Sequence, residues 1–318
     1  MKQVAVFSDE TGENRRGFLG GSDAAAVLGV SDWTTPVGLW LEKTGREPAR
    51  RPDPARQRVL DRGKKLEPFI VDMVVDKLEE QGHDVEVVAT NQRYTDPQFE
   101  FLRAEIDVEL LVDGVLVNGD AKSASGFLRK KWGDEGTDEI PIGYAAQFQH
   151  GMMVTGRGRT LCAALVGLDD VLIYWIPRDV ETIEGMRAME VEFWRGHVQA
   201  DVPPDPRRFS DMRDMHPREN GRTIEATGPI DVAVSELRRL RGFKRQLEQR
   251  EGELMFEIAQ HMGPHSRLTR NGELIATWTT EQRSQFLLAD FKRKHKGMAE
   301  LFTQREDSRV LRLPRGRR

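Results

Sequence analysis

Two aspartates and a lysine flank a short turn within residues 105–122. Asp107 precedes the dipeptide Asp113-Gly114, and Asp120 and Lys122 follow it. Asp-Gly favours a two-residue hairpin turn, which would place Asp107 directly opposite Asp120 on the neighbouring strand. Two facing carboxylates destabilise a sheet unless something compensates their charge. A bound Mg²⁺ or Mn²⁺ would do so, and Lys122 on the same face could hold a metal-polarised water or a phosphate oxygen.

The opposite face of this predicted hairpin is apolar, because the flanking runs alternate between apolar and polar residues. The expected core face comprises Ile106, Val108, Leu110, Val112, Val115, Val117 and Ala121. Taken alone, the polar face is more simply explained as a solvated surface that does no chemistry, since short motifs also occur by chance.

A glycine-flanked helix start near the N-terminus has the composition of an anion site. Ser22 is a natural N-cap, alanines follow it, and Gly29 is a plausible C-terminal stop. Gly20 and Gly21 allow close backbone approach, and two arginines lie just upstream, a combination that suits a phosphate group. A capped surface helix is the alternative.

Three further segments carry candidate residues. A helix expected from about residue 63 to 81 has an apolar stripe that includes Phe69, and Glu67 lies at the edge of that stripe. After the hairpin, a basic loop that includes Lys130 and Lys131 is either a phosphate contact or a solvated loop. A helix opening at Pro141 then places Tyr144, Gln147 and His150 on one face, with His150 expected to be structural.

The motifs resemble those of a known nuclease family. Asp107, Asp120 and Lys122 are spaced as in the PD-(D/E)xK nuclease signature, although Ile106 stands where that signature has Pro. The string Tyr-x-x-Gln-x-Gln-His, which begins at Tyr144, is similar to a signature of the YqaJ viral recombinase family, which is lambda-exonuclease-like. The resemblance covers roughly residues 15–205.

The resemblance implies a fold, an activity and roles for single residues. The fold would be an α/β restriction-endonuclease-like core with a central mixed sheet flanked by helices, followed by a smaller α+β module. The activity would be a Mg²⁺- or Mn²⁺-dependent deoxyribonuclease, an exonuclease that digests duplex DNA ends 5′ to 3′ and leaves a 3′ strand. The implied metal site comprises Glu67, Asp107, Asp120 and the Ala121 carbonyl, with Lys122 and Gln147 as further catalytic residues. The implied DNA contacts are Arg15 and Ser22 at the 5′-phosphate, with Lys130, Lys131 and Tyr144 nearby.

The family also implies a biological setting, namely phage or prophage recombination in the bacterial cytoplasm, with a single-strand annealing protein as partner and a homo-oligomeric ring that encloses DNA. Two alternatives stay open at this point. One is a related nuclease that acts on single strands or flaps. The other is a non-catalytic DNA-binding or assembly factor built on a nuclease core.

Composition sets further limits. Residues 1–200 hold 24 Lys and Arg against 34 Asp and Glu, a net charge of −10, whereas residues 201–318 hold 24 against 18, a net charge of +6. DNA contacts in the first part must therefore use local basic clusters. The single Cys162 permits no internal disulfide and no four-cysteine iron–sulfur site. No apolar run suits a signal or a membrane span, so a reduced cytoplasmic protein without membrane contact is expected.

The chain is expected to divide into a nuclease domain (1–206), a linker (207–230) and a C-terminal module of helices and a hairpin (231–318). A helix expected over about 231–262 repeats apolar residues every seven positions, but Lys244 and Glu251 interrupt the seam. A short helical hairpin or a partner-docking helix is therefore expected rather than a long coiled coil. Asn271-Gly272 predicts a β-hairpin turn further on.

Overall fold

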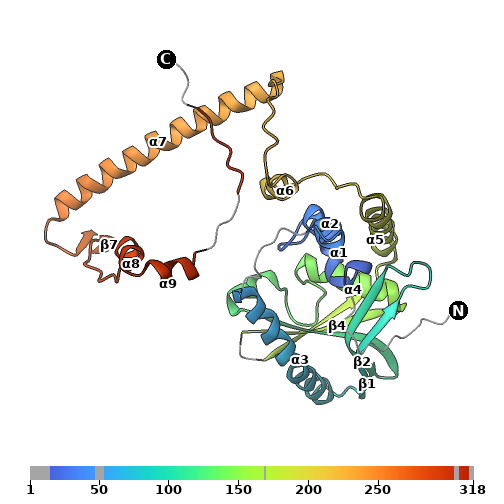
Figure 1. Ribbon diagram of the computed structural model, residues 1–318. Helices are drawn as coiled ribbons and strands as arrows, with labels where there is room; N and C mark the ends of the chain where they lie inside the picture. The colour runs from blue at the N-terminus through green and yellow to red at the C-terminus, as the bar shows by residue number, and fades with distance from the viewer. Residues whose placement is uncertain (1–14, 47–53, 168–169, 304–307, 315–318) are drawn as a thin grey trace. The chain divides into compact units, whose positions relative to one another are not determined.

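The computed structural model describes residues 15–46, 54–167, 170–303 and 308–314 (Figure 1). The chain divides into two compact units, Met1–His216 and Pro217–Arg318. None of the helices in the described residues is long and apolar enough to cross a membrane.

The first unit is built on a mixed five-stranded sheet. Its strands are β1 (Val85–Thr95), β2 (Arg103–Val112), β3 (Val115–Ala124), β4 (Arg159–Val166) and β5 (Val171–Pro177), in that order across the sheet. β3 and β4 run parallel, and the other neighbouring pairs are antiparallel. The expected fold class, a mixed sheet flanked by helices, is confirmed.

Helices cover both faces of this sheet (Figure 1). The helical segments of the first unit are η1 (Arg15–Gly17), α1 (Gly21–Val27), α2 (Pro36–Lys43), α3 (Pro54–Glu80), η2 (Gly126–Lys131), α4 (Ile142–Thr155), α5 (Val180–Glu192), η3 (Phe193–Gln199) and α6 (Phe209–Met215). α3 packs on one face, in a core that includes Ile70, Val108 and Leu161. α4 packs on the other face, where α1, α2 and α5 complete a core that includes Phe148 and Met152.

The central hairpin has the predicted register. Asp113 and Gly114 both have positive φ, 50° and 76°, as a type I′ turn requires. Paired positions run from Val112–Val115 to Val108–Gly119. Two predictions for this hairpin are wrong. Val115, next to the turn, is 51% exposed. Ile106 belongs to the core under α4, not to the α3 core that holds Val108. The apolar side chains of β2 therefore pack on the α4 side before Asp107 and on the α3 side after it.

Two helix starts differ from those expected. The N-cap of α1 is Gly20 rather than Ser22, because Asp23 Oδ2 accepts the backbone N–H of Gly20 at 3.0 Å. Gly29 ends the helix as predicted, with φ of 74°. α3 begins at Pro54, nine residues before the expected start at residue 63. The polar and basic residues at its beginning carry no apolar stripe, so periodicity did not reveal them; Phe69, assigned to the stripe, is 56% exposed.

Part of the segment expected to be a linker packs on the first unit. Asp211 in α6 is 3% exposed, and its Oδ1 accepts the Thr35 hydroxyl at 2.9 Å. The backbone N–H groups of Arg207 and Arg208 donate to Asp211 Oδ2 at 2.8 and 3.0 Å. These bonds cap a helix of only seven residues, too short for a periodic signal in the sequence.

A truncated chain provides a test of this boundary. We expect a chain ending at His216 to fold and to keep the site described below. A chain ending at Pro206 should be less stable by ~1–3 kcal/mol, because Thr35 loses its buried acceptor. Thermal denaturation of the two truncated proteins measures the difference. Equal melting temperatures would show that α6 adds nothing to the first unit.

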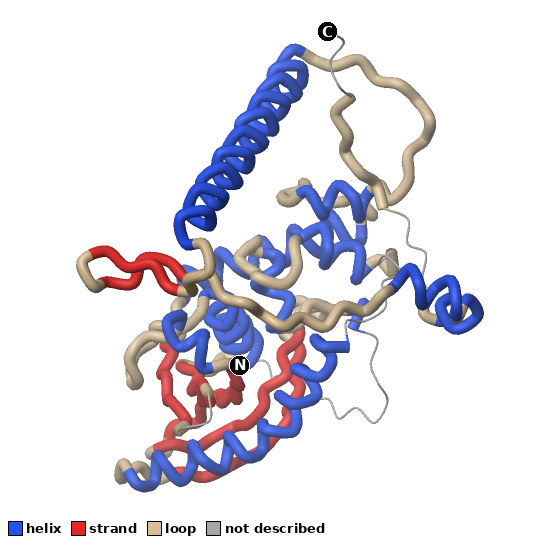
Figure 2. Tube along the Cα trace, turned by 90° about the vertical axis from the view of Figure 1, so that its left-hand side faces the viewer, coloured by secondary structure: helices blue, strands red, loops and turns tan. Residues whose placement is uncertain are grey.

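The second unit contains one long helix and a small hairpin. Its elements are α7 (Gly228–Met262), β6 (Arg267–Arg270), β7 (Glu273–Thr277), α8 (Leu288–Lys294) and α9 (Lys296–Leu301). The turn at Asn271 and Gly272 has the predicted positive φ at both residues. α7 is a single continuous helix of 35 residues rather than the helical hairpin offered as one alternative (Figure 2).

Candidate functional site

A cleft of about 700 Å³ opens beside the point where the pairing of β2 with β3 ends. Its walls come from η1, α1, α3, α4 and the first four strands. Six of the predicted site residues line it: Arg15, Ser22, Glu67, Asp107, Asp120 and Gln147. The tertiary structure thus brings together side chains from six separate elements of the chain.

Asp107 and Asp120 form the acidic centre of the cleft. Asp120 is 6% exposed, and Asp107 is partly buried, with its Oδ2 accepting the backbone N–H of Ala121 at 3.0 Å. Burial, together with the charge of Asp120, raises the pKa of Asp107 to about 7. The nearby charge of Lys122 lowers the pKa of Asp107 but does not offset burial and the charge of Asp120, so the two carboxyl groups are only partly compensated. The pair is therefore suited to a divalent cation.

Lys122 supplies the nearest positive charge. Its Nζ forms an ion pair with Asp120 Oδ1, and its side chain is 15% exposed. Burial by itself lowers the pKa of Lys122, but the charges of Asp120 and Asp107 raise it above its ordinary value. The ammonium also lies 5.5 Å from the centre of the Tyr144 ring and 5.7 Å from that of Phe148. Lys122 is therefore charged and held beside the carboxylates.

Gln147 fixes the second oxygen of Asp120. Its Nε2 donates to Asp120 Oδ2 at 3.1 Å from the face of α4 that borders the cleft. α1 packs closely on this residue: a Cβ at Gly21 would come within 3.2 Å of the Gln147 side chain. A glycine at position 21 therefore lets α1 approach without displacing the amide that orients Asp120.

Glu67 lies on α3, which covers the sheet face opposite α4, and it lines the same cleft as Asp107 and Asp120. It is half-buried, and burial followed by the charge of Asp107 raises its pKa. Among the residues that the structure describes, no three His, Cys, Asp or Glu side chains are gathered as a ready metal site. The side chains suited to a cation in this cleft are therefore the carboxylates of Asp107 and Asp120, and the Glu67 carboxyl lines the same cleft.

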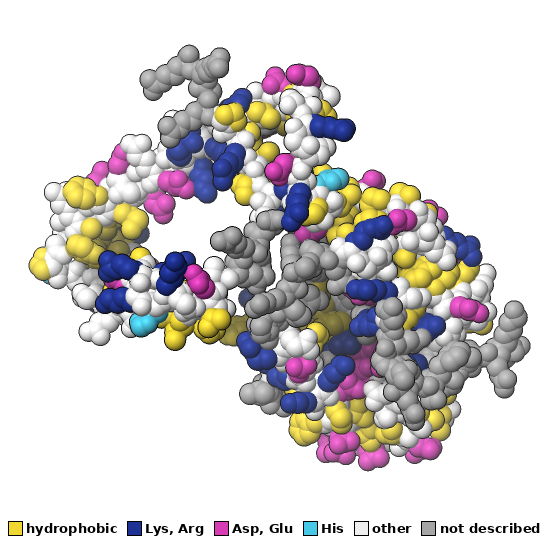
Figure 3. Space-filling view, viewed as in Figure 1, with side chains coloured by type: hydrophobic (Ala, Val, Ile, Leu, Met, Phe, Trp, Pro, Cys, Tyr) yellow, Lys and Arg dark blue, Asp and Glu magenta, His cyan; other side chains and the backbone are white. Residues whose placement is uncertain are grey.

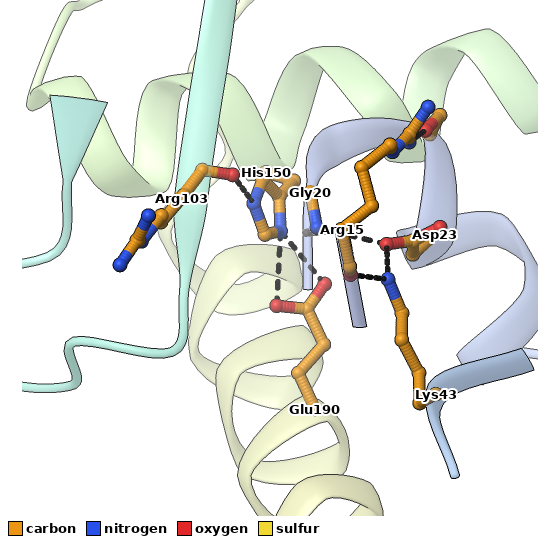
Figure 4. Close-up of polar contacts among 8 residues, drawn as sticks. Arg15, Gly20, Asp23, Lys43, Arg103, His150 and Glu190 are labelled. Carbon is orange, nitrogen blue, oxygen red and sulfur yellow. Dashed lines mark hydrogen bonds and ion pairs between the residues drawn. The ribbon is translucent and has the colours of Figure 1, made fainter. Parts of the chain in front are cut away.

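Arg15 and Ser22 meet at one end of the cleft. Arg15 Nη2 donates to Ser22 Oγ at 2.8 Å. Beneath them Lys43, whose side chain is fully buried, donates to the Arg15 carbonyl oxygen at 2.8 Å and to Asp23 Oδ2 at 2.7 Å (Figure 4). The same Asp23 oxygen accepts the Gly20 N–H. This buried ion pair ties the backbone of Arg15 to the start of α1, while the Arg15 guanidinium is held by Ser22.

His150 lies behind the cleft wall, where it is fully buried. Its Nδ1 is 2.9 Å from Glu190 Oε2, and its Nε2 is 2.8 Å from the carbonyl oxygen of Arg103 (Figure 4). Both ring nitrogens face acceptors, which only the doubly protonated ring can satisfy. Burial by itself lowers the pKa of His150, but the Glu190 carboxylate raises it above its ordinary value. The pair joins α4, α5 and β2, as befits the structural role expected for His150.

This ion pair predicts a pH dependence of stability. A histidine whose folded-state pKa is raised stabilises the fold below its ordinary pKa, and that stability is lost as pH rises through the raised value. Glu190→Gln should lower the free energy of unfolding at pH 6.5 by ~3–5 kcal/mol, because a buried charge loses its partner. The loss should shrink at alkaline pH. Glu184→Gln, an exposed change on the same helix, is the control; equal effects of the two changes in denaturant unfolding would contradict this role.

Three predicted DNA contacts do not line the cleft. Tyr144 packs against Trp132, with ring centres 5.6 Å apart, and contacts the site through Lys122 and through Phe148, which lines the cleft. Lys130 is exposed on η2, and Lys131 Nζ pairs with Asp32 Oδ2 at 2.9 Å. Their assignment to DNA remains a prediction.

The cleft also contains basic residues that the sequence did not single out. Lys64, Arg93 and Arg103 belong to its lining, and the Arg103 guanidinium lies 5.0 Å from the centre of the Phe18 ring. Lys64 stands one helical turn before Glu67 and could have been found by that spacing. Arg93 and Arg103 lie on β1 and β2, where no motif marks them, so only the sheet reveals their place.

Comparison with known proteins gives the following similarities. Residues 12–158 match the YqaJ-like viral recombinase domain. The protein YqaJ of Bacillus subtilis (strain 168), described as uncharacterized, is 31% identical over 206 residues, which are 64% of this chain. The chain spans 60% of the length of that relative.

Solved structures also show similarity. The crystal structure of an alkaline exonuclease, LHK-Exo, from Laribacter hongkongensis aligns with a TM-score of 0.41 and 19% identity, over 59% of this chain and 91% of that chain. LHK-Exo in complex with dAMP aligns over the same shares with a TM-score of 0.39 and 18% identity.

Proposed function

We propose, from the match of residues 12–158 to the YqaJ-like viral recombinase domain, that this chain is a divalent-metal-dependent nuclease that digests duplex DNA from its ends, 5′ to 3′. The observation that carries the proposal is the carboxylate pair Asp107 and Asp120, with Lys122 beside it, in a cleft also lined by Arg15 and Ser22. These are the donors and charges that phosphodiester hydrolysis needs.

The cation site that fits this chain is formed by Asp107, Asp120 and the Ala121 carbonyl, with Glu67 assisting directly or through water. Mg²⁺ or Mn²⁺ held there supplies Lewis acidity to the scissile phosphate and lowers the pKa of a bound water. Gln147 keeps Asp120 oriented through its bond to Oδ2. Lys122 balances the charge of Asp120 and orients the attacking water or a phosphate oxygen.

Different parts of the cleft would bind different parts of the DNA substrate. Arg15, with Ser22, binds the terminal 5′-phosphate of one strand at its end of the cleft. Lys64, Arg93 and Arg103 attract the sugar–phosphate backbone along the walls. Local basic clusters of this kind are needed because residues 1–200 carry a net charge of −10 and so exert no general attraction on DNA.

The wider setting rests on the family resemblance. Digestion from the 5′ end would leave a 3′ strand for a single-strand annealing protein in phage or prophage recombination. A homo-oligomeric ring around the DNA and a cytoplasmic location belong to the same proposal.

A nuclease assay on end-labelled DNA tests the activity. We expect duplexes with 5′-phosphates to be shortened from the 5′ end in Mg²⁺ or Mn²⁺, and to stay intact in EDTA. Preferred cleavage of single strands or flaps would point to the related nuclease class instead. Binding of the duplex without cleavage in either metal would favour a non-catalytic DNA-binding factor and overturn the proposal.

A further inference from the structure

α7 exposes a long apolar stripe. A helix of 35 residues is about 50 Å long. Leu240 is 52% exposed and Leu247 is 70% exposed, and Figure 3 shows hydrophobic side chains at the surface of this unit. A leucine stripe of this length on an exposed helix needs a covering surface.

The stripe follows the seven-residue repeat of a coiled coil. One set of seam positions holds Ile230, Leu237, Lys244, Glu251 and Ile258. The alternate set holds Ala233, Leu240, Leu247, Leu254 and His261. Five consecutive repeats fit within the helix, enough for a stable two-helix seam. The two charged positions near its middle then decide which partner it accepts.

We propose that α7 pairs in antiparallel orientation with α7 of a second copy of this chain. A parallel, in-register pair would place each Lys244 against the partner's Lys244 and each Glu251 against the partner's Glu251. Both are like-charge contacts in the centre of the seam, which disfavour such pairing. Lys244 and Glu251 therefore disfavour the common parallel, in-register arrangement.

In the antiparallel arrangement the same two residues become complementary. When the helices overlap fully, Gly228 lies level with the partner's Met262, so residues whose numbers sum to about 490 face each other. Lys244 then packs beside the partner's Leu247, and the partner's Glu251 lies one turn further, about 6 Å along the axis. The symmetry of the pair makes this contact twice.

Two kinds of layer are apolar in this arrangement, whereas Glu251 packs beside the partner's Leu240 and His261 beside the partner's Ile230. Leu237 meets the partner's Leu254, and Ala233 meets the partner's Ile258. Layers that pair leucine with leucine in this way bury the stripe that the single chain exposes.

The residues beside the seam also fit. Arg241 faces the partner's Glu248, an opposite-charge pair that occurs twice. Glu236 faces the partner's Glu257, a like pair, but Arg250 already lies 4.0 Å from Glu257 in its own helix. These flanking pairs are compatible with the reversed pairing, and the choice of direction comes from Lys244 and Glu251.

Disulfide cross-linking of the full chain tests the antiparallel pairing of α7 directly. Leu237→Cys and Leu254→Cys together place two thiols in one predicted layer. Under mild oxidation the double variant should form covalent dimers in non-reducing denaturing gels, whereas each single variant should stay largely monomeric. The natural Cys162 will not interfere, because it is fully buried and burial raises the pKa of its thiol. Circular dichroism confirms that each variant keeps its helix.

The outcomes separate the alternatives. Cross-linking of both single variants would indicate a parallel pair and overturn the proposal; no cross-linking of the double variant would show that α7 does not pair with itself. Adding Glu251→Lys to the double variant should reduce the dimer yield about tenfold, because it brings lysines together. Adding Lys244→Glu as well should restore the yield. Failure to restore it would contradict the antiparallel direction. Because nuclease activity is not the readout, the result is independent of the proposed function.

Discussion

Asp120→Asn should abolish metal-dependent cleavage while leaving the fold intact. The change removes a charge without changing volume, and Gln147 Nε2 can still donate to the remaining carbonyl oxygen. One of the two carboxylates that fit the cation is lost, so we expect the cleavage rate to fall at least about a thousandfold, or ~4 kcal/mol. Initial rates on a 5′-phosphorylated duplex in saturating Mg²⁺ measure the loss.

The melting temperature in the presence of Mg²⁺ tests the metal site without a measurement of nuclease activity. Mg²⁺ should raise the melting temperature of the unsubstituted protein, because it binds the folded state alone, and this rise should vanish in Asp120→Asn. The metal-free variant should melt close to the unsubstituted protein, since relief of repulsion with Asp107 is offset by the lost ion pair with Lys122. Asp72→Asn, an exposed change on α3, is the matched control. Full cleavage by the Asp120 variant would eliminate the assigned site.

Arg15→Ala should make the enzyme indifferent to the phosphate at the DNA end. The guanidinium is held at Ser22 in the cleft and can bind two phosphate oxygens at once. A terminal phosphate carries more charge than an internal one, so the contact distinguishes the end from the body of the strand. Loss of such a contact costs ~1.5–3 kcal/mol, or roughly ten- to a hundredfold in rate, on 5′-phosphorylated duplexes. The rate on 5′-hydroxyl duplexes should change little.

The adjacent arginine gives a matched control for this experiment. Arg16→Ala removes the same charge one residue away, and Arg16 does not belong to the cleft lining. Comparing both variants on both substrates at fixed salt separates a pocket for the end from general attraction to the backbone. If Arg15→Ala and Arg16→Ala slow both substrates equally, the 5′ preference arises elsewhere.

Local rules were sufficient for the centre of the site. Asp113-Gly114 specifies a turn in which both residues have positive φ, and the alternation around it then determines that Asp107 and Asp120 approach each other. The family resemblance read from the same segment and from the Tyr144 helix is confirmed by the domain match. The turn and its two strands could be predicted because residues that are close together in the sequence specify them.

Only the tertiary structure decided what surrounds those two carboxylates. Lys43 anchors Arg15 across 28 residues, His150 finds Glu190 across 40, and Asp211 reaches back to Thr35 across 176. No periodicity or motif encodes such pairs, because each depends on how whole helices pack. The mistaken place of Ile106 has the same origin. Strict alternation assumes that β2 and β3 stay paired, but their ladder ends at Val108, and beyond it β2 is paired with β1 alone. The sequence by itself thus determined the hairpin and its acids, whereas the packing of distant segments decided the cleft, because its walls are held by contacts between residues far apart in the chain.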